Sequence, residues 1–97
     1  MAATRTRPYD SADHLDTPEA IAAYLTAAFA TADASFIARA VGVAARAKGM
    51  SEIAKQAGLS RENLYRSLNG ETKTEFETIV RVLDAMGVQL TVATKAA

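Results

Sequence analysis

The chain has 97 residues, which is enough for one domain with a single modest hydrophobic core and too few for two. Apolar residues make up 49% of it, but only 6% are aromatic and many are alanine, a composition typical of closely packed helices. Eleven basic and eleven acidic side chains cancel, and the absence of cysteine excludes disulfides, thiol catalysis and thiolate metal sites.

An N-terminal arm is predicted over residues 1–16, which are polar and show no helical period. Thr17 followed by Pro18 predicts a helix start, because the threonine oxygen can accept hydrogen bonds from N–H groups and proline at the first helical position loses none. This helix is expected to end near Ala32. Its buried face is expected to contain Ile21, Leu25 and Phe29, with Tyr24 and Ala28 beside them.

A second helix is predicted from Asp33, whose side chain suits an N-cap, to Lys48 and Gly49. Arg46 and Lys48 suit its C-terminal end, because the helix dipole is negative there. Its apolar stripe is expected to contain Phe36, Ile37, Ala40, Val43, Ala44 and Ala47.

Two short helices are predicted next, one from Ser51 to Gly58 and one from Ser60 to Asn69. Gly58 suits the positive φ of a tight turn between them. Two short helices around such a turn are typical of the helix-turn-helix, in which the second helix enters the DNA major groove. Their inward residues are expected to be Ile53, Ala54, Ala57, Leu59, Leu64 and Leu68.

A fifth helix is predicted up to Gly87, starting at a capping box formed by Thr74 and Glu77. Its apolar face is expected to contain Phe76, Ile79, Val80 and Leu83.

After this helix, Val88, Leu90 and Val92 alternate with more polar residues, a pattern typical of a half-buried β-strand. The strand could pair with the arm near residues 4–9, or with a strand of another chain, either a second copy or a different protein. The alternative is a frayed tail with chance alternation.

Packing does not explain the polar residues of the fourth helix. Arg61 and Arg66 can bind guanine O6 and N7 or clamp a phosphate, and Ser60 with the N–H groups beside it can accept a phosphate. Glu62 could accept from cytosine, but a capping box with Ser60 is favoured. Tyr65 could contact a thymine methyl or a phosphate, or pack against Arg61.

The segment MSEIAKQAGLSRENLYRSLNGETKTEFETIVRVLDAMGVQL resembles the Cro/C1-repressor type of helix-turn-helix, also called the XRE type. With LDTPEAIAAYLTAAFATAD and ARAVGVAARAKGM, nearly the whole chain is similar to HigA-like probable addiction-module antidote proteins, the antitoxins of type II toxin-antitoxin pairs. The resemblance implies a Cro/repressor-like domain, so the chain is expected to form an all-α, five-helix domain at residues 17–87, followed by the short C-terminal β-strand that the alternation predicts within residues 88–97.

The same resemblance implies two partners. One is a small toxin of the RelE/ParE class, and the other is operator DNA, which a homodimer would bind to repress its own operon. By position it implies recognition-helix roles for Ser60, Arg61, Glu62, Tyr65, Arg66 and Asn69. By analogy it implies contacts to the DNA backbone from Ser51, Lys55, Asn69 and Lys73.

Local charge agrees with two partners. Residues 46–73 hold six basic and three acidic side chains, whereas residues 1–33 hold two basic and five acidic ones. The acidic part could meet a basic toxin, although an ordinary solvated surface is the favoured interpretation of such scattered carboxylates.

No catalytic site, metal site or cofactor is predicted, because His14 is the only histidine and has no obvious partner. No apolar run approaches the roughly 18 residues of a membrane span, and the first residues lack an apolar signal core, so a cytoplasmic protein without membrane contact is expected. Two alternatives to the antitoxin remain open: a stand-alone repressor without a toxin, and an interaction adaptor that does not bind DNA.

Overall fold

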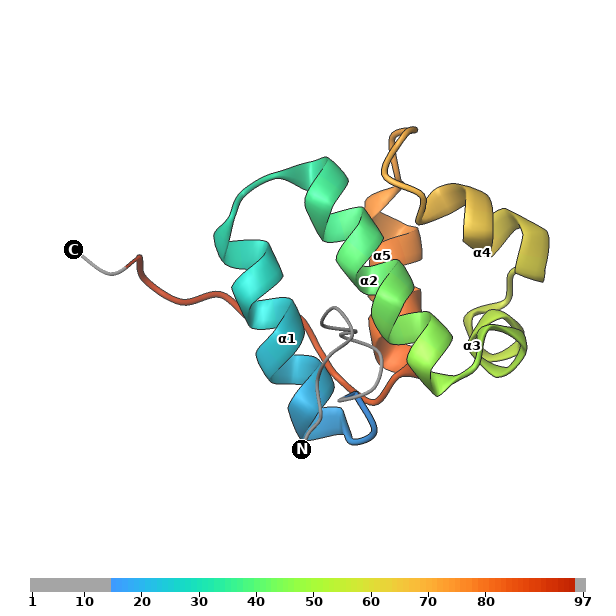
Figure 1. Ribbon diagram of the computed structural model, residues 1–97, viewed down its shortest axis with the longest axis horizontal. Coiled ribbons are helices and arrows are strands. Elements are labelled where there is room, and N and C mark those ends of the chain that lie inside the picture. Colours follow the sequence, from blue (N-terminus) through green and yellow to red (C-terminus); the bar gives the residue numbers. More distant parts are fainter. Residues whose placement is uncertain (1–14, 96–97) are drawn as a thin grey trace, which may run out of the picture.

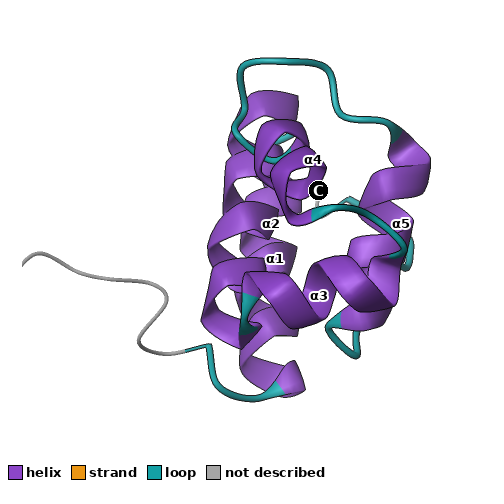
Figure 2. Ribbon diagram, turned by 90° about the vertical axis from the view of Figure 1, so that its right-hand side faces the viewer, coloured by secondary structure: helices purple, strands orange, loops and turns teal. Residues whose placement is uncertain are grey.

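A computed structural model of the protein describes residues 15–95. This part of the chain confirms the prediction of a compact, mostly helical domain, and Figure 2 shows only helices and loops within it. Its five helices are α1 (Pro18–Ala30), α2 (Ala34–Lys48), α3 (Met50–Ala57), α4 (Arg61–Ser67) and α5 (Phe76–Ala85) (Figure 1).

Helix α2 lies at the centre of the domain. It packs against α1, α3 and α5, and α3 packs against α4 and α5. Helices α1 and α4 therefore lie at opposite ends of the molecule, with α2 and α5 between them (Figure 1).

The core contains apolar side chains from all five helices, and no polar side chain among the described residues is buried. Leu15, the last hydrophobic residue of the predicted arm, is also buried, whereas residues 1–14 of that arm lie outside the described residues. The largest completely buried side chains are Ile21, Ile53, Leu64, Met86, Val41 and Val82.

Three predicted N-caps are confirmed. In each, a side-chain oxygen accepts a hydrogen bond from the backbone N–H three residues later and so satisfies a donor that the helix leaves unpaired. The acceptors are Thr17 at 3.1 Å, Asp33 at 3.1 Å and Ser60 at 3.0 Å.

The predicted capping box at the start of α5 is wrong. Glu75 takes the cap position without a side-chain cap bond, and the Thr74 hydroxyl instead donates to the carbonyl of Ser67. Glu77 forms an ion pair with Arg81 one turn along the helix, with 2.8 Å between the nitrogen and the oxygen. Thr74 therefore ties the loop to the end of α4 instead of starting α5.

Two predicted core aromatics are largely exposed. Phe76 is 69% exposed and Phe36 is 42% exposed, and Val80 is 43% exposed. Each of these residues lies in or near the first turns of its helix, whereas the core face of α5 is formed further along, by Val82 and Leu83 together with Ile79. Helical period alone predicted these side chains to be buried, but no neighbouring element within residues 15–95 covers them.

The predicted C-terminal strand is not formed, since residues 88–95 belong to no helix or strand. The N–H of Val88 donates to the Leu83 carbonyl at 3.1 Å, and beyond it the backbone of residues 89–95 has no hydrogen bond to any described residue. A strand needs a partner, and residues 15–95 supply none. The suggested pairing with residues 4–9 lies outside the described residues.

Candidate nucleic-acid interface

Helices α3 and α4 are joined by a tight turn at Gly58. This residue has φ 76° and ψ 30°, a left-handed conformation that glycine adopts without steric cost. The N–H groups of Gly58 and Leu59 donate to the carbonyls of Lys55 and Ala54, at 3.3 and 2.9 Å, which ends α3 in a Schellman motif. The predicted positive φ of Gly58 is confirmed.

Two leucines hold α4 against the domain. Leu64 is completely buried and Leu68 nearly so. On the facing surface of α2, a Cβ added to Gly42 would lie 3.0 Å from the Leu68 carbonyl oxygen and 3.3 Å from its Cβ. A helix as short as α4 has little stability of its own, so these contacts set its orientation.

The residues predicted to bind DNA all lie on the surface. Their exposure leaves them available to a partner, and none is used to build the core. They are Ser51, Lys55, Ser60, Arg61, Glu62, Tyr65, Arg66, Asn69 and Lys73.

Arg61 and Tyr65 form a cation–π pair on the outer face of α4, with the guanidinium carbon 5.7 Å from the ring centroid. Both line a shallow hollow of about 540 Å³ between α4 and the junction of α2 with α3, together with Arg46, Ser51 and Glu52. Arg46 was not among the predicted DNA-binding residues. The excess of basic residues over residues 46–73 was its only signal in the sequence.

Two hydrogen bonds in and next to α4 bear on the predicted capping box of Ser60 and on the availability of Arg66. The residue three positions after Ser60 is Asn63, and its N–H is the one that Ser60 caps. The favoured capping box between Ser60 and Glu62 is therefore wrong, and Glu62 forms no side-chain hydrogen bond to a described residue. The guanidinium of Arg66 donates to Asn63 Oδ1, which leaves its other N–H groups for a partner.

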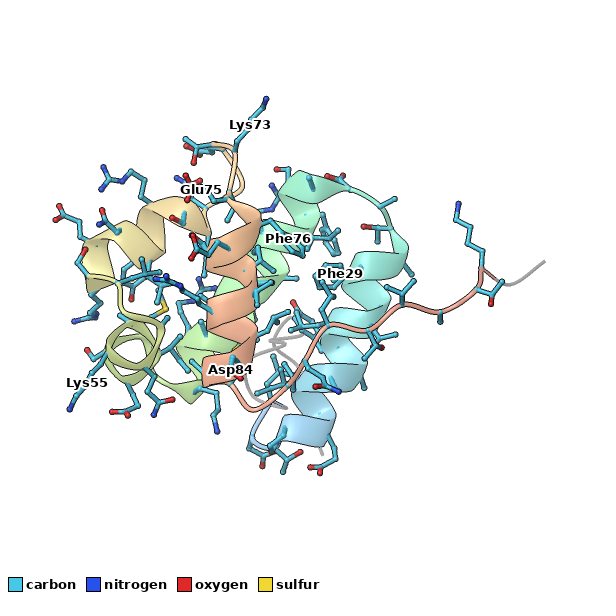
Figure 3. All side chains as sticks on the ribbon, turned by 180° about the vertical axis from the view of Figure 1, so that it is seen from behind. Phe29, Lys55, Lys73, Glu75, Phe76 and Asp84 are labelled. Atoms are coloured by element: carbon cyan, nitrogen blue, oxygen red, sulfur yellow. The ribbon has the colours of Figure 1, made fainter. Side chains whose placement is uncertain are left out.

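The remaining predicted residues lie around α4 rather than at one point. Asn69 Oδ1 accepts from the N–H of Glu71 at 2.8 Å and so shapes the turn after α4. Lys55 projects from α3 and Lys73 from the tip of the loop between α4 and α5, on opposite sides of α4 (Figure 3). Of the predicted residues, the hollow thus brings together only Ser51, Arg61 and Tyr65.

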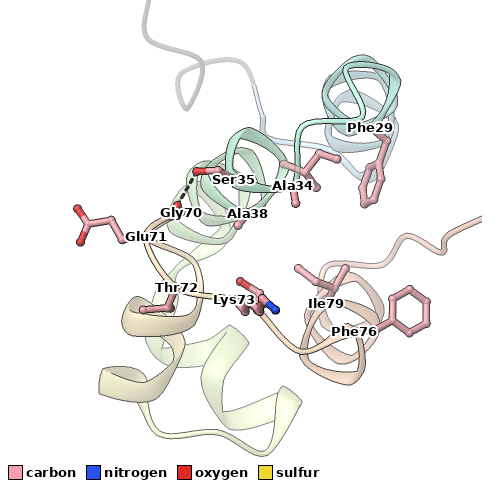
Figure 4. A pocket seen from close by; sticks show the side chains of 12 residues that line it. Phe29, Ala34, Ser35, Ala38, Gly70, Glu71, Thr72, Lys73, Phe76 and Ile79 are labelled. Carbon is pink, nitrogen blue, oxygen red and sulfur yellow. Dashed lines mark hydrogen bonds between the residues drawn. The ribbon is translucent and has the colours of Figure 1, made fainter.

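A second surface is an apolar groove of about 510 Å³ (Figure 4). It lies between the start of α2, the end of α1, the loop after α4 and the start of α5, where Ser35 Oγ donates to the carbonyl of Gly70. Phe29 and Phe76 lie on the other side of α5 from α4 (Figure 3). The apolar side chains of the groove are Phe29, Ala34, Ile37, Ala38, Phe76 and Ile79.

Comparison with known proteins gives one family. Residues 5–94 match the family described as "Probable addiction module antidote protein". The chain belongs to this family. It is also 38% identical over 86 residues, which is 89% of either chain, to a Haemophilus influenzae protein described as uncharacterized. No solved structure gives a significant match.

Membership of an antidote family indicates a toxin-antitoxin role and implies a toxin partner in general. Within residues 15–95, no group of three or more His, Cys, Asp or Glu side chains could hold a metal ion, and no helix of that region is long and apolar enough to cross a membrane. The antidote protein's two surfaces offer guanidinium, ammonium, hydroxyl and apolar groups, which bind partners through hydrogen bonds, charge and apolar contact.

Proposed function

We propose that this antidote protein is the antitoxin of a type II toxin-antitoxin module, which binds and neutralises a RelE/ParE-class toxin and represses its own operon. In this proposal α3 and α4 form a helix-turn-helix of the Cro and XRE type, and a homodimer reads a palindromic operator in the cytoplasm. Family membership supports the toxin-antitoxin part, and the construction of α4 supports the DNA-binding part.

One observation carries the DNA-binding proposal. Helix α4 is anchored from inside by Leu64 and Leu68, while Arg61, Tyr65 and Arg66 face outward. A helix that is held along one side and presents planar donors on the other suits the major groove, where a guanidinium can bind O6 and N7 of guanine in a bidentate manner.

The surroundings of α4 suit the phosphate backbone at the edges of that groove. The guanidinium groups of Arg46 and Arg61 and the hydroxyl of Ser51 line one hollow, and all can donate to a phosphate oxygen. Lys55 and Lys73 flank α4 and would contact the backbone as point charges. These contacts would position the recognition helix without reading sequence.

The toxin is proposed to bind at the apolar groove. Phe76 is 69% exposed at its edge, and an aromatic side chain of this exposure is typical of a protein-binding surface. Glu71 lines the groove and Glu75 precedes Phe76, which suits a basic toxin, although Lys73 also lines it. Phe29 and Phe76 lie on the other side of α5 from α4, so a toxin bound at these aromatics would leave α4 free for DNA, while Lys73 belongs to both surfaces.

Co-expression with the product of the neighbouring gene tests both parts. We expect that product to be toxic alone and harmless with this chain, and we expect the chain to shift its own promoter fragment in a gel. Phe76→Asp should abolish rescue and leave DNA binding intact, whereas the Arg61→Ala/Arg66→Ala double variant should do the reverse.

Other outcomes separate the alternatives. A promoter shift without any toxic neighbour would indicate a stand-alone repressor. Rescue without any promoter shift would indicate an adaptor and would overturn the role of α4. A Phe76→Asp variant that rescues fully would place the toxin on another surface.

A further inference from the structure

The C-terminal segment, residues 88–93, carries the apolar side chains of Val88, Leu90 and Val92, and beyond the N–H of Val88 its backbone forms no hydrogen bond to a described residue. Val88 packs partly against the core, and in an extended strand Leu90 and Val92 would lie on the same face as Val88, because side chains alternate along such a strand. Leu90 is 40% exposed and Val92 is 97% exposed. An apolar segment with unpaired N–H and C=O groups is a ready site for pairing with another strand.

The sequence of this segment is complementary to itself in one register. In a symmetric antiparallel pair centred on Leu90, the two Leu90 side chains face each other, and Val88 faces Val92 of the second copy. Centring the pair on Thr91 would place Val88 opposite Thr94, and centring it on Gln89 would place Val92 opposite Met86, which is buried. Only the register on Leu90 pairs Val88, Leu90 and Val92 entirely with one another.

The surface next to this segment, on the side of α1, also suits contact with a second copy. A hollow of about 180 Å³ lies between the C-terminal segment and α1, and residues 88–91 and Ala93 line it together with Leu83 and, from α1, Ala22, Leu25, Thr26 and Phe29. In the register on Leu90, the second copy's Val92 lies next to Val88, at the edge of this hollow. The most exposed valine of each copy would thus be covered by the other copy.

We infer that two copies of this chain associate through antiparallel pairing of residues 88–92, supported by the adjoining face of α1. The inference rests on the homodimer of the proposed function and names the segment that forms it. A two-stranded pair alone is marginally stable, so the contacts with α1 are part of the interface. The segment lies at the end of the molecule away from α4, which stays exposed in both copies (Figure 1).

Single-cysteine variants test the register, because the chain has no cysteine of its own. Leu90→Cys should form an intermolecular disulfide under mild oxidation, since Cα atoms of directly opposed residues are about 4.5–5.5 Å apart, within disulfide range. Gln89→Cys and Thr91→Cys should each cross-link poorly alone and readily when mixed. Gln56→Cys, on the exposed side of α3, measures disulfides from random collision.

Light scattering on Leu90→Asp tests how much the paired segment contributes to the stability of the dimer. The substitution removes two leucines from the interface and places two carboxylates opposite each other, so the dimer dissociation constant should rise by roughly tenfold or more. Circular dichroism checks that helix content is unchanged, as expected for a position outside all five helices.

The outcomes separate this inference from the proposed function. A dimer whose Leu90→Cys variant cross-links no more than Gln56→Cys overturns the pairing and leaves the homodimer standing. If the native chain is monomeric at every concentration, both the strand pairing and the proposed homodimer are wrong. Promoter binding and toxin rescue are measured in separate assays, so they test the rest of the proposed function independently. If Leu90→Asp leaves the dimer intact but abolishes toxin binding, the segment pairs with the toxin and the inference is wrong.

Discussion

Replacing both outward arginines of α4 by alanine should weaken operator binding and flatten its dependence on salt. Arg61 and Arg66 are exposed and their guanidinium groups have no carboxylate partner among the described residues, so the double variant should fold normally. If each arginine contacts one phosphate, a dimer loses four contacts and the slope of log K against log salt falls by about 3.6. If the two proteins bind equally at about 1 M salt, the variant binds about 10³-fold more weakly at about 0.15 M.

Fluorescence anisotropy of a labelled promoter fragment, titrated at several salt concentrations, measures both the affinity and the slope. Lys95→Ala is the matched control, because it removes a basic side chain at the far end of the C-terminal segment. If the arginines read guanine instead, the slope should change little and discrimination against a mutated operator should fall by about 1–3 kcal/mol for each base pair. An unchanged affinity, slope and discrimination would remove both residues from the interface.

Three further substitutions test the framework that holds α4. Gly58→Ala should destabilise the protein by about 1–2 kcal/mol in urea unfolding, since the left-handed φ of Gly58 is unfavourable for alanine. An unchanged stability would contradict the role assigned to this turn. Leu64→Ala should cost about 2–5 kcal/mol in the same assay, whereas Tyr65→Ala, its exposed neighbour, should cost less than about 1 kcal/mol; equal losses would contradict the assigned orientation of α4. Gly42→Ala should lower the melting temperature, because the added Cβ would lie 3.0 Å from the backbone oxygen of Leu68. Alanine favours helix, so a rise in melting temperature would show that α4 can shift away.

Local features of this fold could be predicted from the sequence because single residues determine them. Thr17, Asp33 and Ser60 cap helices through their own side chains, and Gly58 adopts a backbone conformation that other residues disfavour. The capping box at Thr74 failed for the opposite reason. Its hydroxyl had a competing acceptor at Ser67, seven residues away, which no local pattern reveals.

Burial was harder to predict than helix position. The period of α5 correctly placed Ile79 and Leu83 inside, but the same pattern placed Phe76 there, where no neighbouring element covers it. A hydrophobic stripe predicts which side of a helix is apolar, and the extent of its cover depends on the lengths and positions of the other helices. The exposed end of the stripe is the part that forms the apolar groove.

The candidate DNA surface was also only partly predictable from the sequence. Arg61 and Tyr65 lie four residues apart on one short helix, so the period of that helix was enough to place them on a common face, while Arg66 is exposed on another side of it. Arg46 reaches the same hollow from a different helix, because the junction of α2 with α3 brings its side chain toward α4. A sequence pattern relates residues within one element, whereas a binding surface joins several elements. Only the packing of α2, α3 and α4 decides which basic side chains line the same hollow. If the chain binds DNA as proposed, substitutions at Leu64 or Gly42, which set that packing, should weaken promoter binding in the anisotropy assay even though both residues are buried and cannot contact DNA themselves.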